Sequence, residues 1–170
     1  NAQLFDDVQN MKNYNESILE SMSNAVITID EDGKIITCNA AGYRIMKITD
    51  ADIIGKRYDE FFTNPNAWIV EKLKRVEESQ KSDVTIDADL IIGKEKLSVN
   101  LTILPLMSAE GKKLGSMLMV EDISSEKRMK STMSRYMDPG LADQLLAQGE
   151  EILGGKSTMA TVLFSDIRSF

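Results

Sequence analysis

The stretch of sequence that decides the fold is MSNAVITIDEDGKIITCNAA, residues 22–41. Two apolar runs in it alternate with polar residues, and the tetrapeptide Glu31-Asp-Gly-Lys34 separates them. An Asp-Gly pair between alternating apolar runs is a strong β-hairpin signal. We therefore predict a pair of antiparallel strands at residues 25–29 and 35–38.

The periodicity of the remaining chain predicts the other elements. Short helices are expected at residues 40–46, 49–52 and 59–62, and a longer helix at residues 66–80. Three strands are expected at residues 84–90, 97–103 and 114–123, followed by two helices at residues 125–137 and 138–149. A buried strand is expected from Met159 to Asp166. This order is not a β-α-β alternation, so it indicates an α+β fold. The expected architecture is a five-stranded antiparallel sheet with helices on one face, flanked by a helix at each end.

The last strand of this sheet is expected to be buried on both faces. Residues 114–123 are apolar on both faces in the middle of the strand. A strand of this kind is normally covered on both sides. We expect the N-terminal helix to be the lid over the second face.

The first 22 residues carry a helical period. The spacing 4-3-4-3-4 relates Leu4, Val8, Met11, Asn15, Ile18 and Met22, which we call the seam. About three heptads of this kind predict a coiled coil, in which a lone asparagine at an a position pairs with its own copy in a parallel dimer. The alternative is an amphipathic helix that packs on its own domain.

Composition excludes several classes of function. The chain has 170 residues, with 27 acidic and 20 basic side chains, a net charge of −7, one cysteine and no histidine. An acidic surface repels nucleic-acid phosphates and anionic lipid, and no apolar run is long enough to cross a membrane. The lack of histidine excludes histidine general bases, histidine-ligated haem and the phospho-acceptor of a histidine kinase. The single Cys38 excludes an internal disulfide, and we expect a cytoplasmic protein.

Residues 22–127 resemble a PAS domain. The resemblance rests on four motifs in the expected order, Met22-Ser-Asn-Ala-Val-Ile-Thr-Ile-Asp, Cys38-Asn-Ala-Ala, Ile54-Gly and Glu121-Asp-Ile-Ser-Ser-Glu-Lys. The last motif is similar to the Asp-Ile-Thr-x-Glu-Lys ending that couples such domains to an outgoing helix. The resemblance implies an N-terminal helix, a PAS domain and an output helix at residues 1–22, 23–124 and 125–137.

The resemblance also implies where a PAS domain would hold a ligand. The expected lining residues are Ile27, Ile29, Met46, Ile53, Trp68, Leu101, Ile103 and Met117. We expect no haem, and no covalent flavin because residues 55–62 lack the reactive cysteine of the flavin-binding subfamily. An apolar set of this kind is also what an ordinary core contains, so a plain core is the alternative.

Residues 135–170 resemble the start of a class III adenylate or guanylate cyclase. The first matching motif is Arg135-Tyr-Met-Asp-Pro-Gly-Leu-Ala-Asp-Gln-Leu-Leu, which leads into a transducing segment at residues 138–157. The second is Ala160-Thr-Val-Leu-Phe-Ser-Asp-Ile-Arg-Ser-Phe, at the start of a catalytic domain in residues 158–170. The resemblance implies that Asp166, with the carbonyl of Ile167, binds Mg²⁺ or Mn²⁺. Ser169 departs from the glycine that is usual there. The other catalytic residues of the family would lie beyond Phe170, so we expect no catalysis by this chain alone. The alternative for Asp166 is that it is an ordinary surface carboxylate.

These observations together predict a regulatory relay. Asn1-Ala-Gln-Leu-Phe is similar to the last helix of a GAF domain, which implies an upstream GAF domain. We expect a parallel homodimer that regulates a downstream cyclase domain of the same chain, which makes cAMP or cGMP. The expected relay residues are Asn15, Asp122, Ser124, Met129, Met133 and Tyr136. The alternatives are a PAS sensor whose pocket ligand sets the output, and a diguanylate cyclase or a kinase as the output.

Overall fold

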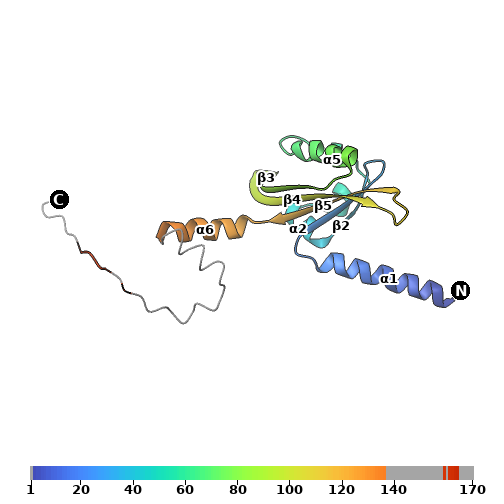
Figure 1. Ribbon diagram of the computed structural model, residues 1–170, viewed down its shortest axis with the longest axis horizontal. Helices are drawn as coiled ribbons and strands as arrows, with labels where there is room; N and C mark the ends of the chain where they lie inside the picture. The colour runs from blue at the N-terminus through green and yellow to red at the C-terminus, as the bar shows by residue number, and fades with distance from the viewer. Residues whose placement is uncertain (1, 137–158, 160, 165–170) are drawn as a thin grey trace. The chain divides into compact units, whose positions relative to one another are not determined.

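The computed structural model describes residues 2–136, 159 and 161–164 (Figure 1). Its elements follow the order α1 (Ala2–Ser21), β1 (Ala25–Asp30), β2 (Ile35–Cys38), α2 (Ala40–Met46), α3 (Asp50–Ile53), α4 (Tyr58–Phe61), α5 (Trp68–Ser79), β3 (Asp83–Ile92), β4 (Glu95–Met107), β5 (Lys113–Asp122) and α6 (Ser124–Tyr136). The chain divides into two compact units, Asn1–Lys127 and Arg128–Phe170, and the boundary falls within α6.

The sheet has five strands in the order β2-β1-β5-β4-β3, and every neighbouring pair is antiparallel. The predicted hairpin joins β1 to β2. The carboxylate of Asp30 holds its turn by accepting hydrogen bonds from the N–H groups of Asp32 (3.0 Å) and Lys34 (2.8 Å). The predicted α+β fold with a five-stranded antiparallel sheet is confirmed.

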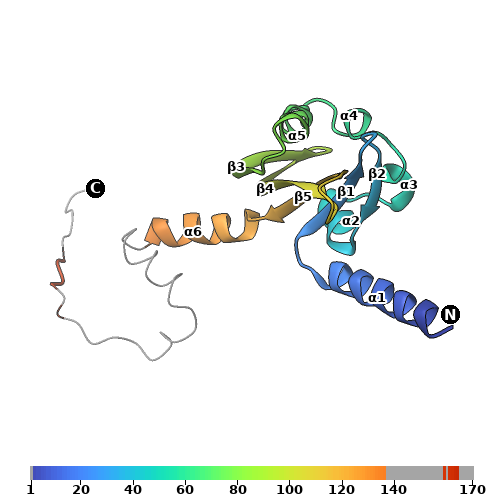
Figure 2. The ribbon, with the colours of Figure 1, turned by 45° about the vertical axis from the view of Figure 1, so that its right-hand side comes forward.

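The core lies between one face of the sheet and the helices α2 to α5. Figures 1 and 2 show α5 along this face, where it contacts β4 and β5. Its apolar residues follow the helical period that predicted it, and alternate residues of the strands meet them. The most deeply buried members of this cluster include Ile27, Ile29, Ile69, Leu73, Leu118 and Val120.

The opposite face of the sheet is only partly covered. Met117 and Met119 alternate with Leu118 and Val120 along β5 and are half-buried. Helix α1 lies mainly against α2 and does not cover β5. The prediction that α1 is the lid is therefore wrong, because only the last turns of α1 are bonded to the domain.

Strands β1 and β5 approach each other closely at Gly115. This residue has φ +136, and a Cβ atom there would lie 1.9 Å from the carbonyl oxygen of Ile29 and 2.9 Å from Cα of Asp30. Only glycine fits this conformation and this space. Gly115 is paired with Asp30, so it fixes the register of the two central strands.

The predicted strand at residues 159–166 is described only at Met159 and residues 161–164. These residues have no regular secondary structure, and their large apolar side chains are exposed at Met159, Val162, Leu163 and Phe164. The prediction of a buried strand is wrong for these described residues, because no described strand pairs with them. Among the described helices, none has the length and apolar content needed to span a bilayer.

Candidate functional site

The end of α1 is tied to the sheet by one buried side chain, Asn39. Its Oδ1 accepts hydrogen bonds from the N–H groups of Val26 (2.9 Å) and Gly42 (3.0 Å). Its Nδ2 donates to the carbonyl oxygens of Leu19 (2.8 Å) and Asn24 (3.0 Å). Asn39 is only 3% exposed. We call these five residues the incoming junction, because they join α1, β1 and α2 at a single point.

The local sequence explains why Asn39 occupies this position. Asparagine is a preferred N-cap residue, and Asn39 caps α2 with an extended backbone at φ −83 and ψ 171. From α1, the carboxylate of Glu20 accepts a second hydrogen bond at this helix end, from the N–H of Ala40 (2.9 Å). Burial, followed by the charge of Glu20, raises the pKa of the Cys38 thiol to about 11. Cys38, at the end of β2, is therefore a buried apolar residue.

A cleft of about 390 Å³ opens beside the incoming junction, between the end of α1 and β2. Leu19, Val26, Ile36 and Ile54 form its apolar walls, and three carboxylates, from Glu16, Glu20 and Asp50, lie around them. Burial and then the nearby acidic groups of Cys38, Asp50 and Glu20 raise the pKa of Tyr43, which also lines the cleft. No basic residue lines it.

The start of α6 is tied to the sheet by polar groups from β4 and β5. The N–H of Ser124 donates to Oδ1 of Asp122 (2.9 Å), and the N–H of Ser98 donates to Oγ of Ser124 (3.0 Å). The N–H of Ile123 donates to the carbonyl oxygen of Ser98 (2.9 Å). The predicted relay residues Asp122 and Ser124 thus meet at this point, and Ser124 is buried.

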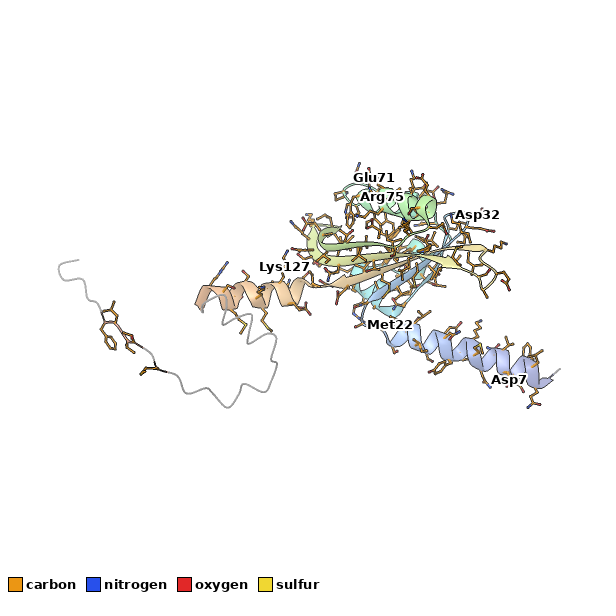
Figure 3. All side chains as sticks on the ribbon, viewed as in Figure 1. Asp7, Met22, Asp32, Glu71, Arg75 and Lys127 are labelled. Atoms are coloured by element: carbon orange, nitrogen blue, oxygen red, sulfur yellow. The ribbon has the colours of Figure 1, made fainter. Side chains whose placement is uncertain are left out.

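An ion pair extends this connection to β3. Nζ of Lys127, labelled in Figure 3, donates to Oδ1 of Asp87 and lies 3.4 Å from Oγ of Ser98. Asp87 has φ +56 and sits where the register of β3 and β4 shifts. Its N–H donates to Oδ1 of Asn100 (3.1 Å), whose Nδ2 donates to Oε2 of Glu121 (2.8 Å). We call Asp87, Ser98, Asp122, Ser124 and Lys127 the outgoing junction.

A second cleft, of about 300 Å³, lies next to the outgoing junction. It brings together residues that precede β1, residues of α2 and residues around the start of α6. Its lining residues are Ser23, Asn24, Arg44, Ile45, Glu121, Asp122 and Glu126. The segments that bring the chain into the sheet and out of it therefore border the same space.

The predicted interior residues mostly share one cluster. Six of them are buried together in the core, namely Ile27, Ile29, Met46, Ile53, Leu101 and Ile103. Trp68 is partly buried and packs against this cluster. Met117 lies on the opposite face of β5, so it does not line the interior with the others. Strand alternation places neighbouring residues on opposite faces, which is why Met117 and Leu118 separate.

One polar atom in the interior, Oγ of Ser116, was not predicted from the sequence. Ser116 is 1% exposed, and its Oγ has no hydrogen-bond partner among the described residues. It shares a face of β5 with Leu118. A buried hydroxyl without a partner is unusual, because burial costs free energy that a hydrogen bond would offset. No sequence pattern distinguishes it from an ordinary strand serine.

The seam residues within α1 are not covered by the chain's own domain, whereas Met22, the last seam residue, follows α1 and is half-buried. The exposed fractions are 67% for Leu4, 62% for Val8, 67% for Met11 and 44% for Ile18, and Asn15 is exposed among them. Packing on the same domain, the alternative for this helix, is therefore wrong for these residues. In α6, Met129 is exposed, Met133 is half-buried and Tyr136 is the final residue.

Two predicted site residues, Asp166 and Ile167, lie outside the described residues. The metal site assigned to them stays a prediction. Within the described part of the chain, no group of three or more acidic or cysteine side chains is arranged to hold a metal ion.

Comparison with known proteins identifies the family of this fold. The model of the PAS fold matches residues 13–123. The chain is similar to a PAS domain from Colwellia psychrerythraea (TM-score 0.56, 14% identity, 68% of this chain and 98% of that one) and to the PAS domain of Bordetella pertussis BvgS (0.56, 14%, 76% and 97%).

A third similar structure is the light-state dimer of the fungal photoreceptor Vivid (TM-score 0.50, 14% identity, 60% of this chain and 79% of that one). At these identities the solved structures show the fold alone. A search of curated proteins found no match. The family match covers well over half of the 170 residues and includes the incoming junction and the part of the outgoing junction that precedes Ser124. The chain belongs to the PAS family.

Proposed function

We propose that this chain is the regulatory PAS module of a class III nucleotidyl cyclase. It dimerises in parallel through α1 and passes changes in helix position to α6. The catalytic domains of that cyclase would follow α6 and would make cAMP or cGMP. In this proposal the chain itself is a relay rather than a catalyst.

The observation that carries the proposal is the exposed seam. Four large apolar side chains, on Leu4, Val8, Met11 and Ile18, are between 44% and 67% exposed on one stripe of α1. Exposed apolar stripes with a heptad spacing are buried when two helices pair. The lone Asn15 within the stripe favours a parallel dimer with its copy in register.

The sheet offers a short route from α1 to α6. The incoming junction lies at the start of β1, and β1 pairs directly with β5, which leads into α6. Ala25 at the start of β1 is paired with Val120 near the end of β5. A displacement of α1 therefore reaches the start of α6 through two bonded central strands.

The cyclase output rests on the resemblance of residues 135–170 to the transducing segment and first catalytic strand. In the complete enzyme, Asp166 and the carbonyl of Ile167 would hold Mg²⁺ or Mn²⁺, which would supply charge stabilisation for phosphoryl chemistry. Residues beyond Phe170 would complete the site.

Insertion of residues after Lys127 in the complete protein tests the relay. One inserted residue rotates everything that follows by about 100°, whereas seven residues restore the heptad phase. We expect the single insertion to change cyclase output more than the seven-residue insertion. The same insertions after Gly93, in the turn between β3 and β4, are the control. Equal effects of both lengths after Lys127 would contradict a phase-dependent relay.

A second candidate function is a sensor whose interior ligand sets the output. The unpartnered Oγ of Ser116 favours it, because a bound molecule would give that hydroxyl a hydrogen-bond partner. Native mass spectrometry of the chain separates the two candidates. Twice the chain mass of 19.0 kDa with nothing attached supports the ligand-free relay. Additional stoichiometric mass supports the sensor, and a monomer at micromolar concentration contradicts the seam as a dimer interface.

A further inference from the structure

We propose that the base of α6 is a two-position latch. The ion pair between Lys127 and Asp87 holds the position seen in the structure, and Arg44 of α2 holds a second position by pairing with Glu126. The latch itself is independent of the output domain, but its regulatory consequence rests on the proposed function.

The first position is made by bonds that reach across the sheet. Lys127 donates to Asp87 of β3 and lies near Ser98 of β4. The left-handed backbone of Asp87 is one that L-residues adopt reluctantly, and its N–H is held by the side chain of Asn100. The carboxylate is thus placed by the fold. Both members of the ion pair are about half-exposed, at 49% for Lys127 and 47% for Asp87, so water and salt compete with it.

The second position is prepared but not closed. Arg44 is exposed, and among the described residues its guanidinium makes neither a hydrogen bond nor an ion pair. It lines the same cleft of about 300 Å³ as Asp122 and Glu126. Among the described residues, the carboxylate of Glu126 accepts a hydrogen bond from the hydroxyl of Ser125, its neighbour, at 2.9 Å. An arginine that has no partner in the described part of the chain and an exposed carboxylate thus border one polar space.

The topology makes the two positions compete. Helix α6 continues from β5, which is the central strand of the sheet. Arg44 lies on α2, which packs against β1 on one side of β5, whereas Asp87 lies on β3 beyond β4 on the other side. Movement of α6 toward α2 therefore shortens the distance from Glu126 to Arg44 and pulls Lys127 away from Asp87.

The incoming junction links the position of α1 to the position of α2, which carries Arg44. Asn39 caps α2 and also holds the carbonyl oxygen of Leu19 in α1. A shift of α1 is therefore carried to α2, and with it to Arg44. The latch gives the relay two discrete states at the base of α6 rather than a continuous range of orientations.

Hydrogen–deuterium exchange of the 170-residue chain tests the latch. The readout is the exchange rate of amides in the first two turns of α6, residues 124–131. For Lys127→Met and Asp87→Asn we expect exchange roughly two- to fivefold faster than in the wild type, because a half-exposed ion pair makes a small but measurable contribution to the stability of the first turns of α6. Asparagine tolerates the backbone of Asp87, so the second variant preserves the bulge. Lys81→Met, an exposed lysine that forms no ion pair among the described residues, is the matched control.

The second position is tested in the Lys127→Met background. Arg44→Met should have little effect on the wild type, where the first position dominates. In the Lys127→Met variant it should accelerate exchange further, because neither position remains. Unchanged exchange in Lys127→Met and Asp87→Asn would overturn the first position. Equal effects of Arg44→Met in both backgrounds would overturn the second.

The exchange rates and the output report on different claims. If exchange behaves as expected but Lys127→Met leaves the cyclase output of the complete protein unchanged, the latch stands and the proposed relay fails. If exchange does not respond, the latch fails whatever the output does.

Discussion

The two junctions hold helices to the same sheet with different chemistry. At the incoming junction, the neutral side-chain amide of Asn39 forms hydrogen bonds with backbone groups of α1, β1 and α2, and Asn39 is only 3% exposed. At the outgoing junction the link to β3 is an ion pair whose side chains are about half-exposed. Buried neutral hydrogen bonds are costly to break, whereas exposed ion pairs are weak and are screened by salt. The comparison teaches that the hydrogen bonds at the end of α1 are harder to break than the ion pair that links α6 to β3.

The largest expected effect comes from breaking the incoming junction. Asn39→Ala removes the hydrogen bonds that this side chain makes with the N–H groups of Val26 and Gly42 and with the carbonyl oxygens of Leu19 and Asn24. We expect the free energy of unfolding to fall by about 3 kcal/mol, because several backbone groups lose a buried partner at once. Urea denaturation measures this change.

Asn100→Ala is the matched variant beside the outgoing junction, where Asn100 bonds the N–H of Asp87. Asn100 also bonds a backbone N–H, but its hydrogen bonds are on the exposed side of the sheet. We expect a loss under about 1 kcal/mol. Equal losses for the two variants would erase the difference between the junctions.

The next prediction concerns the seam, where a substitution should affect dimerisation without affecting the stability of the domain. Val8→Asp places a charge in the middle of the exposed stripe of α1, so we expect the proposed dimer to weaken by at least roughly tenfold. The free energy of unfolding of the domain should not change, because Val8 contacts neither junction. Sedimentation velocity measures the dimer. Asn10→Asp adds the same charge off the seam and should leave the dimer intact; weakening by both variants would contradict the seam as an interface.

A smaller effect is expected at Ser124. Its Oγ accepts the N–H of Ser98 and is buried, unlike the ion pair beside it. Ser124→Ala should lower the free energy of unfolding by about 1 kcal/mol. Ser124→Thr keeps the hydroxyl and should retain most of that stability. If both variants were equally destabilised, packing rather than the hydrogen bond would hold this residue.

The smallest effect concerns pH and a third connection, between α5 and β3. Asp83 accepts a hydrogen bond from Lys72 (2.9 Å), and this bond lowers the pKa of Asp83 below its ordinary value of 3.8. The unfolded chain therefore takes up the proton first as pH falls. The stabilisation is present above pH 4 and is lost below it, by an amount under about 1 kcal/mol. Denaturation at several pH values should show this loss, and Asp83→Asn should remove it; an unchanged pH dependence in that variant would assign the loss to other carboxyls.

Local patterns predicted most of the elements. The Asp-Gly turn between alternating runs predicted β1 and β2, and α2 begins and ends at the predicted residues 40–46. The long helix was predicted at 66–80 and is found at Trp68–Ser79. These features depend on neighbouring residues, so a single sequence carries them.

The errors and omissions arise where distant residues meet. Met117 was assigned to the interior by the resemblance to PAS domains, and because β5 is apolar on both faces, alternation alone does not say which face is inside. Lys127 and Asp87 are 40 residues apart, so no local pattern pairs them. Asn39 was quoted within a motif, but its bonds to the end of α1 require the fold. The metal assignment to Asp166 stays a prediction for a different reason, since it lies outside the described residues.

The glycine at position 115 has a consequence for how this sequence can vary. A side chain there would collide with the main chain of β1, so the collision cannot be relieved by choosing another rotamer. In a library of random variants this position should accept one amino acid, while the loops between residues 30 and 115 should accept substitutions and changes in length. Gly115 therefore serves as a fixed reference point from which the strand register of a distant homologue can be aligned.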